Sequence, residues 1–577
     1  MPDQTQGLSR RRVLAGAGGV AAVAVAGATA SAQAASADHW DHEVDVLCIG
    51  SGAAASTAAV IATTEGASAM LLEKMPLAGG TTAKSGGVLW VFNNFVLREQ
   101  GIADPKEDAL RYAVRYGFAR EYDPSSPTLG LDENRYRVLE AFYDNGSAAV
   151  DRLREIDAVQ FKQFRLFQVD RPAPDYADHL PENKVPTGRT LEPAVGSGSS
   201  EGGGSLITHL HAFLDRRKVP ILLETRVTKI VRDAGGRVIG VEAEQEGKPI
   251  RVRARKGVVF GTGGYSHNVE LCRLHQPWVY GTCSLPGSTG DFIQLAAEIG
   301  ARMGNLSTGW RSQVVLGEAL DNRGVGWGAF VLPGDSMLLV NKYGRRIVNE
   351  KRDYNDRTQS HFHYDAAREE YTNHIQLLLF DERSLDAFGG AFPFPANKGE
   401  QPHLIEGASW DQLFANVDAQ MARYANQTGG ARLASSFAET AKQTIAQFNG
   451  YAKAGVDPDF NRGKYLYDRE WHKLFSARRP GTRFPENPYP NPVMHPLADN
   501  GPYYCILLGP GTLDTSGGPQ VNAQAQVLAA DGNPIPGLYA AGNCIAAPTG
   551  QAYLGAGGTI GPAVTFGYIA GKNVVKG

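Results

Sequence analysis

A glycine-rich turn near the end of the chain contains a side chain that could do chemistry. The stretch GQAYLGAGGTIGPAVTFGYIAG covers residues 550–571, and its closely spaced glycines indicate a turn whose backbone approaches another group closely. Tyr553, a large side chain with a hydroxyl, stands inside this turn. A phenol there either packs against its neighbours or hydrogen-bonds a ligand. The elements that surround the turn therefore decide what Tyr553 does.

A second glycine turn lies near the start of the chain, between a predicted strand and a predicted helix. The apolar run 44–49 predicts a buried strand, Gly50-Ser51-Gly52-Ala53-Ala54-Ala55 follows, and an Ala-rich helical stretch extends to about residue 66. A second strand, 69–72, ends at Glu73. The glycines permit a tight turn beside a pyrophosphate, the helix N-terminus supplies amide donors, and Glu73 is placed to bond a ribose hydroxyl. This pattern predicts a dinucleotide site for NAD or FAD.

Three later glycine clusters favour FAD. They cover residues 79–87, 258–264 and 537–543, and strands are also predicted at 221–223, 227–232 and 238–243. FAD spans a long groove and needs contacts from both ends of the chain, whereas one NAD unit does not. We therefore predict FAD as the cofactor. The residues predicted to bind it are Gly50, Gly52, Ala54, Ala55, Glu73, Lys74, Gly80, Thr81, Thr82, Ser85, Gly86, Gly87, Val227, Thr262, Gly263, Gly264, Asp291, Gly542, Asn543, Gly558, Thr559 and Ile560.

The composition of the whole chain limits the partners. The chain has 577 residues, 42% of them apolar, and a formal net charge of −3. This length suffices for one large or two medium domains, and the near-neutral charge gives no reason to expect nucleic acid as a partner. Five scattered cysteines imply no disulfide framework. Two histidine pairs, at 209/211 and 361/363, would splay apart on a helix, so we predict packing or surface roles for them and no metal site.

The first 34 residues are predicted to be an export signal. Arg10, Arg11 and Arg12 precede a mildly apolar Ala/Gly/Val run and small-residue cleavage options at 30–34. The paired arginines resemble a twin-arginine signal, which exports folded proteins and suits an enzyme that acquires its cofactor first. We expect a periplasmic or extracellular protein. A single membrane anchor is the alternative, but the run is poorly hydrophobic, and no later stretch reaches the ~18 apolar residues of a membrane helix.

From Asp45 to its end the sequence resembles the fumarate reductase/3-oxosteroid dehydrogenase superfamily of FAD enzymes. The resemblance implies an α/β fold in which a Rossmann-like FAD-binding domain of the glutathione reductase type carries an inserted α+β substrate domain. The implied boundaries are 43–276 and 502–577 for the FAD-binding domain and 277–501 for the insertion. Within the insertion, residues 287–291 are expected to open a helix, and residues 341–350 to form a strand, a turn and a second strand.

The turn around Tyr553 separates two branches of this superfamily. Fumarate reductases carry an arginine in this position, and their H-T-M-G-G motif reads DTSGG here, from Asp514. A dicarboxylate would therefore find no guanidinium fork in this chain. The 3-oxosteroid Δ1-dehydrogenases instead have Y-P-G-A-G-x-T-I-G-P-A, and the chain reads YLGAGGTIGPA. Their P-G-x-L-G-T-K-G-G motif is similar to PGTLDTSGG at residues 510–518.

The resemblance implies desaturation next to a ketone carbonyl. The Tyr553 hydroxyl and the Gly557 N–H would stabilise the enolate, and Tyr354 would remove the α proton while hydride leaves the β carbon for flavin N5. A phenol with a pKa of ~10 is a poor base unless a neighbour stabilises its phenolate, and Tyr176 is the candidate neighbour. A helix that begins near Thr559 would direct its positive end at the flavin.

The sequence leaves the substrate open. The steroid enzymes usually have a long segment after G-R-S-x-E-P, whereas here a Ser/Gly-rich linker, 196–204, follows and a helix is predicted from about Ser205. A smaller cyclic ketone such as 4-oxocyclohexanecarboxylate is therefore an alternative to a steroid. A fumarate- or urocanate-like alkene reductase is disfavoured by the missing arginine, and a flavin-binding electron carrier by the large second domain. The electron acceptor, whether a quinone, O2 or a redox protein, is not identified.

Overall fold

The largest sheet combines strands from both ends of the chain. The computed structural model describes residues 39–166, 170–194, 202–473 and 486–577, so the predicted export signal lies outside the described residues. The strand order is β22-β23-β11-β1-β2-β8, with β10 pairing β11 and β9 pairing β10. The bounds are β1 His42–Ile49, β2 Ala69–Leu72, β8 Ile221–Leu222, β9 Thr225–Arg232, β10 Val238–Gln245, β11 Lys248–Phe260, β22 Gln526–Leu528 and β23 Pro534–Ala540.

Strand β1 lies in the middle of this sheet, as its apolar run predicts. It is parallel to β11 on one side and to β2 on the other, with Ile49 in register with both Phe260 and Leu72. Helix α1 (Ala53–Thr64) begins directly after the turn. Because the carboxyl ends of parallel strands meet at one edge, the Gly50 turn and Glu73 lie together there. The predicted strand, turn and helix are thus confirmed.

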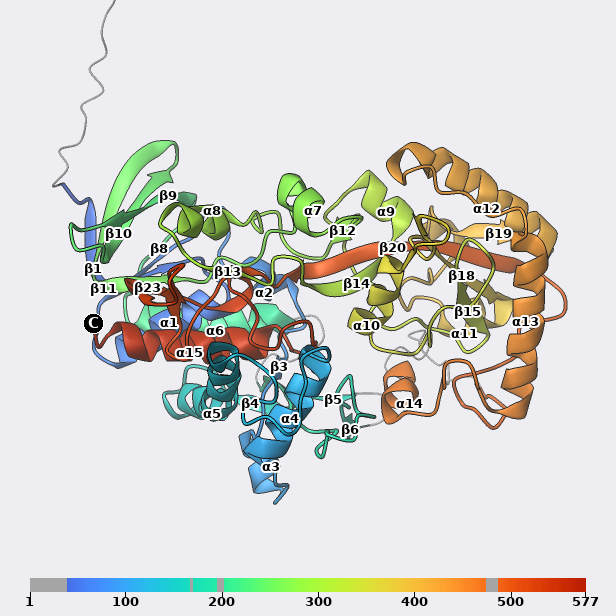
Figure 1. The fold of residues 1–577 in the computed structure, drawn as a ribbon, viewed down its shortest axis with the longest axis horizontal. Helices are drawn as coiled ribbons and strands as arrows, with labels where there is room; N and C mark the ends of the chain where they lie inside the picture. The colour runs from blue at the N-terminus through green and yellow to red at the C-terminus, as the bar shows by residue number, and fades with distance from the viewer. Residues whose placement is uncertain (1–38, 167–169, 195–201, 474–485) are drawn as a thin grey trace, which may run out of the picture. The chain divides into compact units, whose positions relative to one another are not determined.

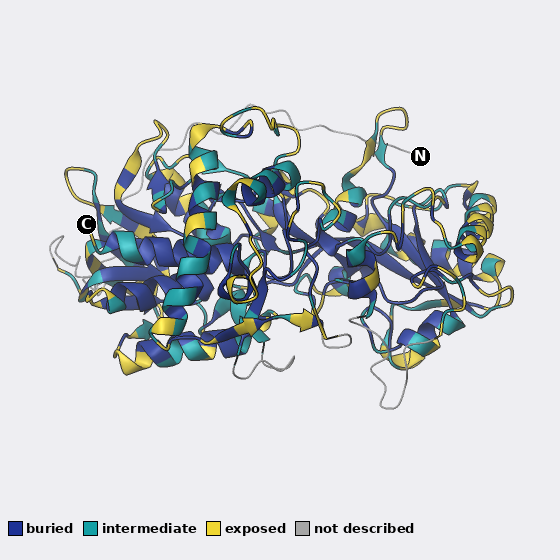
Figure 2. Cartoon of the chain, turned by 90° about the horizontal axis from the view of Figure 1, so that it is seen from below, coloured by how far each residue is buried: buried dark blue, intermediate teal, exposed yellow. Residues whose placement is uncertain are grey.

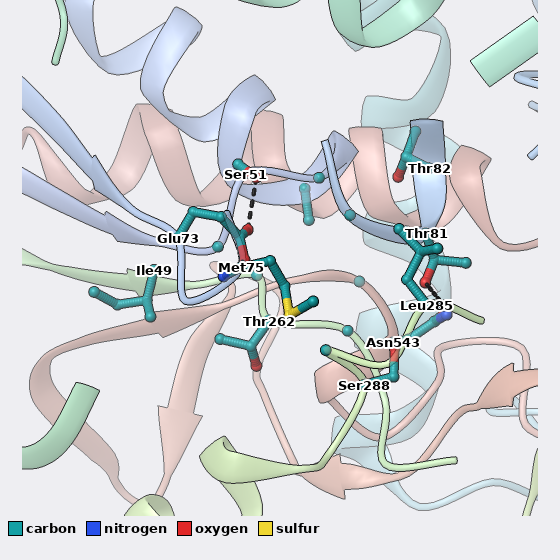
Figure 3. Close-up of a pocket in the computed structure, with 18 of the residues that line it drawn as sticks. Ile49, Ser51, Glu73, Met75, Thr81, Thr82, Thr262, Leu285, Ser288 and Asn543 are labelled. Carbon is teal, nitrogen blue, oxygen red and sulfur yellow. Dashed lines mark hydrogen bonds between the residues drawn. The ribbon is translucent and has the colours of Figure 1, made fainter. Parts of the chain in front are cut away.

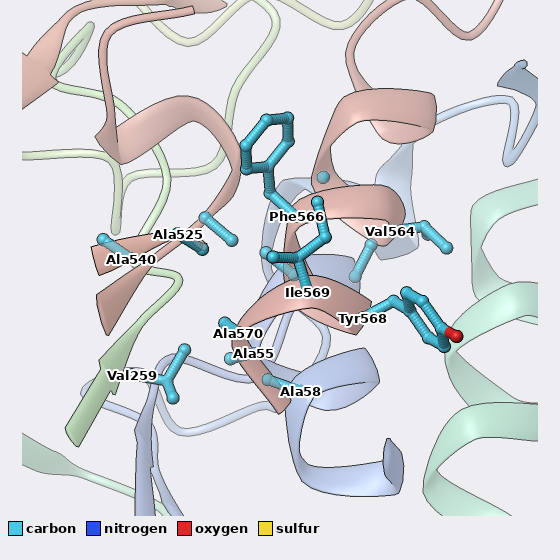
Figure 4. Packing of buried hydrophobic residues seen from close by; sticks show 14 of the residues in the cluster. Ala55, Ala58, Val259, Ala525, Ala540, Val564, Phe566, Tyr568, Ile569 and Ala570 are labelled. Atoms are coloured by element: carbon cyan, nitrogen blue, oxygen red, sulfur yellow. The ribbon is translucent and has the colours of Figure 1, made fainter. Parts of the chain in front are cut away.

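Helix α15 (Ile560–Val574) crosses α1 at close range and buries most of its length. A Cβ atom on Gly567 would lie 2.5 Å from the Ala54 carbonyl oxygen, and one on Gly571 would lie 2.6 Å from that of Ala58. Glycine at these two positions of α15 allows this approach to the backbone of α1, and Figure 4 shows Ala55, Ala58 and Ala570 where the two helices pack. The last helix of the chain is therefore fixed against the first.

Seven further helices, α2 to α8, lie between β2 and β14 along the described chain. Their bounds are α2 Gly80–Lys84, α3 Phe95–Glu99, α4 Lys106–Gly117, α5 Glu133–Glu155, α6 Gly202–Arg216, α7 Val269–His275 and α8 Asp291–Glu298. The prediction that α6 begins near Ser205 was wrong by one turn, because Gly202 and Gly203 belong to it. A Cβ on Gly203 would lie 1.7 Å from the Thr82 carbonyl oxygen, so these glycines of the predicted linker let α6 pack against α2. The rest of the predicted linker lies outside the described residues.

A second, six-stranded sheet is built from the middle of the chain and one later strand. Its order is β12-β20-β18-β15, with β14 and β19 also paired to β20. The long strand β20 is the orange-red arrow of Figure 1. The bounds are β12 Gly281–Thr282, β14 Gly309–Val315, β15 Met337–Val340, β18 Gln376–Asp381, β19 Ile405–Gly407 and β20 Tyr503–Thr515, with helices α9 Leu316–Asp321, α10 Tyr354–Gln359, α11 Glu382–Phe388, α12 Trp410–Tyr424, α13 Phe437–Ala454 and α14 Leu466–His472.

The predicted strand–turn–strand at residues 341–350 was wrong. Strand β15 ends at Val340, and the residues after the turn form only one isolated bridge, between Val340 and Arg346. The physical reason lies in the side chains: Glu350 is buried and receives hydrogen bonds from Arg346 and Arg462. These side-chain hydrogen bonds fix residues 341–350 in place of the backbone ladder that a pair of strands would have formed.

Burial follows the two sheets, which Figure 2 shows in dark blue beneath exposed loops and helix faces. Strand β20 begins at Tyr503 and pairs in the six-stranded sheet, and the chain rejoins the large sheet at β22. The predicted domain boundaries stay a prediction. Within the described residues no helix is long and apolar enough to cross a bilayer, and no group of three or more His, Cys, Asp or Glu is arranged for a metal ion.

Candidate active site

The first glycine turn and Glu73 are joined by a side chain that lies between the two glycines. Gly50 has φ +97°, and a Cβ there would lie 2.6 Å from the Gly261 carbonyl oxygen. The Ser51 hydroxyl donates to Glu73 Oε2 at 2.6 Å, and the Met75 N–H donates to Oε1 at 2.9 Å (Figure 3). The acid is therefore oriented before any ligand binds. The sequence prediction missed Ser51, although its hydroxyl between two turn glycines was the available signal.

A cleft runs along this edge of the sheet and collects most of the predicted cofactor residues. Those that line it are Gly50, Gly52, Ala54, Glu73, Lys74, Gly80, Thr81, Thr82, Ser85, Val227, Thr262, Gly263, Asp291, Gly542, Asn543, Thr559 and Ile560. Residues that the sequence prediction missed also line it, among them Met75, Leu285, Ser288 and Asp514. Figure 3 shows that the side chains of Met75, Leu285 and Ser288 come from segments far apart in the chain.

Five predicted cofactor residues are not among those lining the cleft: Ala55, Gly86, Gly87, Gly264 and Gly558. Three of these glycines have packing reasons of their own. A Cβ on Gly87 would lie 2.4 Å from the Gly202 carbonyl, one on Gly264 would lie 2.4 Å from Asp514 Oδ1, and one on Gly558 would lie 3.1 Å from the Tyr553 ring. Ala55 packs on Gly261, the close helix–strand contact that the fingerprint's third small residue serves.

The cleft has polar groups that fit a dinucleotide. Helix α1 presents its N-terminus there, and its N-cap residue, Gly52, has no side chain to cap it. The Ala53 N–H donates to Thr82 Oγ1 at 3.1 Å, and the amides that follow in the first turn are the donors for phosphate. The Thr262 hydroxyl is buried, and among the described residues it interacts with the Cys544 thiol and with no oxygen or nitrogen, so it keeps hydrogen-bonding capacity for a ligand. Lys74 donates to Asp291 Oδ2 at 3.0 Å, so these two predicted binding residues pair with each other. Acid, hydroxyl and backbone donors together fit the ribose and pyrophosphate of FAD.

Three predicted catalytic tyrosines, which are far apart in the sequence, meet next to the final turn. The Tyr176 hydroxyl donates to the Tyr354 hydroxyl oxygen at 3.1 Å. The ring of Tyr553 is stacked on that of Tyr176, with centroids 5.4 Å apart, and lies 5.4 Å from that of Tyr354. Tyr354 is the first residue of α10, and the Tyr176 N–H donates to the Leu554 carbonyl beside Tyr553. The arrangement brings the three hydroxyl-bearing rings into one cluster.

All three phenols are buried and titrate above the ordinary range. Burial raises the pKa of Tyr354 and of Tyr176 well above 10. Burial also raises the pKa of Tyr553, with hydrogen bonding to Tyr354 and Thr559 as an opposing influence. Near pH 7 each therefore carries its proton in the free enzyme. Tyr553 is suited to donate a hydrogen bond, whereas Tyr354 needs a partner to stabilise its phenolate before it can accept a proton.

Gly557 presents an unused backbone donor in the same turn. Its φ of +89° is a conformation that favours glycine, and a Cβ would lie 2.5 Å from the Val88 carbonyl oxygen. Its carbonyl accepts from the N–H groups of Trp90 and Gly561, but its own N–H makes no hydrogen bond to any residue that the structure describes. A free N–H in the turn that holds Tyr553 is what an oxyanion site requires.

Apolar and aromatic side chains enclose the tyrosines. Trp310 of β14 lies edge-on to Tyr553 at 5.5 Å, and Phe330 lies 5.1 Å from Tyr354. The other members of this cluster are Leu166, Ala173, Val331, Tyr467, Trp471, Ala547 and Ala556, with Val88, Phe164 and Leu513 partly buried against it. Such walls exclude water and favour a ligand that is mostly hydrocarbon. The predicted histidine pairs lie elsewhere: His361 bonds the His374 carbonyl, and His211 bonds Ser51 and Ser56.

Comparison with known proteins agrees with this geometry. Residues 45–560 match the model of a family described as FAD binding domain. The chain belongs to this family. It is 30% identical to 4-oxocyclohexanecarboxylate 2-dehydrogenase of Sinomonas cyclohexanicum, over 92% of each protein. It is 29% identical to 3-oxosteroid 1-dehydrogenase of Mycolicibacterium smegmatis, over 92% of this chain and 97% of that protein.

A solved structure supports the same relationship. The 3-ketosteroid delta1-dehydrogenase from Sterolibacterium denitrificans, in complex with 1,4-androstadiene-3,17-dione, superposes with a TM-score of 0.74 at 25% identity. The alignment covers 93% of this chain and all of that one. The predicted fold class, the FAD cofactor, the resemblance to 3-oxosteroid dehydrogenases and the assignment to FAD-dependent oxidoreductases acting on CH–CH groups are therefore confirmed. The roles of individual site residues stay predictions.

Proposed function

We propose that this protein desaturates a cyclic ketone between the carbons α and β to its carbonyl. One observation carries the proposal: Tyr553, Tyr354 and Tyr176 meet beside a turn whose Gly557 N–H is free. A phenol and an amide can both donate to a ketone oxygen, and neither is the cation that a carboxylate substrate would require. The similarity to enzymes named for two cyclic-ketone substrates supports the same reading.

The residues divide the reaction into binding and proton transfer. The Tyr553 hydroxyl and the Gly557 N–H hold the ketone oxygen, and they bind it more tightly as it becomes an enolate oxygen. Tyr354 takes the proton from the α carbon. Bound FAD supplies the hydride acceptor for the β carbon, so two C–H bonds break and one C=C bond forms. The aromatic walls keep water from this step.

Tyr176 makes Tyr354 a usable base. Its hydroxyl donates to the Tyr354 oxygen at 3.1 Å, and a donated hydrogen bond stabilises the phenolate more than the phenol. In the resting protein burial raises the pKa of Tyr354, and its contacts with Tyr176 and Tyr553 raise it further; the Tyr176 hydroxyl stabilises the oxygen of Tyr354 once the proton has been lost. Loss of the Tyr176 hydroxyl is therefore expected to slow proton removal while the ketone still binds.

Aromatic side chains line the approach to Tyr354 that we propose for the substrate. Phe330 lies 5.1 Å from Tyr354, and Trp327, at 6.3 Å from Phe330, is 62% exposed, which is unusual for a tryptophan. An apolar ring that enters past Trp327 and Phe330 reaches Tyr354 along aromatic surface. We propose a 3-oxosteroid or a single-ring ketone such as 4-oxocyclohexanecarboxylate as substrate. An alkene reductase of the fumarate or urocanate kind is the alternative.

An anaerobic half-reaction tests this function. The purified yellow protein is mixed with androstenedione, 4-oxocyclohexanecarboxylate, fumarate or urocanate while flavin absorbance is followed. We expect a saturated ketone to bleach the flavin. If no ketone does so, and photoreduced enzyme is instead reoxidised by fumarate or urocanate, the desaturase proposal is wrong and the alkene reductase replaces it.

We also propose that the protein is exported through the twin-arginine route with FAD already bound. The motif at Arg10 and Arg11 supports this. Reduced FAD must then be reoxidised outside the cytoplasm, by a quinone, O2 or a redox protein.

A further inference from the structure

Asp514 is a buried carboxyl that lines the cofactor cleft and has no part in the predicted mechanism. It stands near the end of β20 and is 1% exposed. The segment reads PGTLDTSGG, whereas the similar motif of 3-oxosteroid dehydrogenases, P-G-x-L-G-T-K-G-G, has glycine in this position. A carboxyl buried in a cofactor cleft needs a physical reason, because burying it is costly.

The carboxyl is surrounded by hydrogen-bond donors. Backbone N–H groups and an amide NH2 can only donate hydrogen bonds. Both oxygens of the Asp514 carboxyl must therefore accept, which fits an ionised carboxylate. The donors are Gly264 N at 2.8 Å, Asn543 Nδ2 at 3.3 Å and Ser288 Oγ at 3.4 Å to Oδ2, with Ser266 Oγ at 2.8 Å and Thr515 N at 2.9 Å to Oδ1. Burial raises the pKa of Asp514, and these donors oppose the rise. The donors on both oxygens hold the carboxyl in one orientation in the cleft, in the arrangement that suits a carboxylate.

The same contacts explain the placing of Gly264 and of Asn543 in the cleft. Gly264 is the second glycine of a pair, and its missing Cβ makes room for the carboxylate. Asn543 lines the cleft, and because its NH2 faces Asp514, its carbonyl oxygen must face the other way. That oxygen accepts from Trp310 Nε1 at 2.9 Å.

Trp310 extends this series of contacts to the catalytic turn. Its ring lies edge-on to Tyr553, with centroids 5.5 Å apart and an interplanar angle of 87°. Asp514, Asn543 and Trp310 therefore form a continuous path from the cofactor cleft to the tyrosine that is proposed to hold the ketone oxygen. Each link fixes the orientation of the next, since the amide of Asn543 has distinct donor and acceptor ends and the indole of Trp310 has a single N–H donor.

We propose that Asp514 is a charged positioning residue: it holds Tyr553 in place through Asn543 and Trp310, and its negative charge lowers the reduction potential of bound FAD. Reduction adds electrons to the cofactor, which a fixed anion in the same cleft opposes. The rate effect rests on the proposed function, whereas the potential does not. Asp514→Asn removes the charge and keeps the size, and Trp310→Phe breaks the path while keeping an aromatic ring against Tyr553.

The test measures two quantities in the FAD-loaded wild type, the two single variants and the double variant. One is the reduction potential of bound FAD, measured against reference dyes. The other is the single-turnover rate at which the ketone that reduces the wild type bleaches the flavin. We expect Asp514→Asn to raise the potential. A higher potential by itself favours reduction of the flavin, so we expect the loss of the hydrogen bond to a charged group to outweigh it and to slow bleaching roughly tenfold. We expect Trp310→Phe to leave the potential unchanged and to slow bleaching, and the double variant to be no slower than Asp514→Asn, because the residues act as one path.

Several outcomes overturn the inference. An unchanged or lowered potential in Asp514→Asn removes the charge effect, and an unchanged rate in Trp310→Phe, or losses that multiply in the double variant, removes the path. If Asp514→Asn does not retain FAD, Asp514→Gly, which restores the glycine of the similar motif, takes its place in the same measurements. If no ketone reduces the wild type, the proposed function fails, and the potentials still test the charge.

Discussion

Replacing Tyr553 by phenylalanine removes one oxygen atom and leaves the ring where it packs. The ring lies 5.4 Å from those of Tyr176 and Tyr354 and 5.5 Å from that of Trp310, contacts that phenylalanine keeps. The side chain is 4% exposed, so no solvent-facing interaction is lost. The variant is therefore expected to fold and to bind FAD, and its defect isolates the hydroxyl.

The size of that defect follows from the two expected donors to the ketone oxygen. With the Tyr553 hydroxyl gone, only the Gly557 N–H remains. Removing one oxyanion donor typically costs about 10²–10³ in kcat, or about 3–4 kcal/mol. The stability cost is smaller: a lost buried hydrogen bond is worth about 1 kcal/mol. We therefore expect kcat to fall at least a hundredfold while the unfolding midpoint shifts only slightly.

Tyr112→Phe is the matched control for this experiment. Tyr112 is also buried, and its hydroxyl donates to the Leu554 carbonyl at 3.3 Å, one residue from Tyr553. Its removal should cost similar stability and leave kcat within about twofold. Ketone turnover, FAD content and thermal unfolding are measured for both variants. A Tyr553→Phe enzyme that retains FAD and turns over within threefold of wild type would refute the role given to this hydroxyl.

Four further predictions test other parts of the account. Because burial raises the pKa of Tyr354 well above 10 in the free enzyme, kcat/KM should increase with pH into the alkaline range, and a flat profile of kcat/KM against pH would contradict Tyr354 as the base. Burial alone would raise the pKa of Glu350, but two buried arginines lower it to about 2. Ionised Glu350 therefore stabilises the fold by on the order of 3 kcal/mol above its ordinary pKa of 4.5, and this stabilisation is lost as pH falls towards 2. Glu350→Gln should make the free energy of unfolding, followed by circular dichroism, depend less on pH in this range. Trp327→Ala should raise KM for the ketone roughly threefold to tenfold with little change in kcat, and an unchanged KM would remove Trp327 from the substrate path. Replacing Arg10 and Arg11 by lysine should retain the yellow protein in the cytoplasm of a bacterium with a twin-arginine system, as fractionation would show, and export at the wild-type level would oppose the proposed route.

Local patterns predicted the nucleotide half of the fold well. The β-branched run before Gly50 is buried on both faces in a parallel sheet, and the Ala-rich stretch after Gly52 forms α1, because these choices depend mainly on neighbouring residues. Residues 341–350 failed for the opposite reason. Their periodicity resembles a strand pair, but Glu350 is held by Arg462, which lies more than a hundred residues away. No local pattern contains that contact.

The site shows the same division. Tyr553 and Gly557 could be found because they stand in one continuous motif, and Tyr354 and Tyr176 because short motifs surround them. Asp514 could not be recognised, since its meaning comes from Gly264 and Asn543, which only the fold brings to it. Gly264 was predicted to bind the cofactor for its position in a glycine pair, whereas its contacts give it the task of accommodating a carboxylate.

The most direct test of the central claim is the identity of the product. Enzyme and a saturated cyclic ketone deuterated at the α and β carbons are mixed without oxygen until the flavin bleaches, and the organic product is analysed by mass spectrometry and NMR. We predict an enone that has lost one deuterium from each of the two carbons. Flavin bleaching should be slower with deuterium at either carbon than with the unlabelled ketone. A ketone recovered unchanged, or a product without the new C=C bond next to the carbonyl, would contradict it.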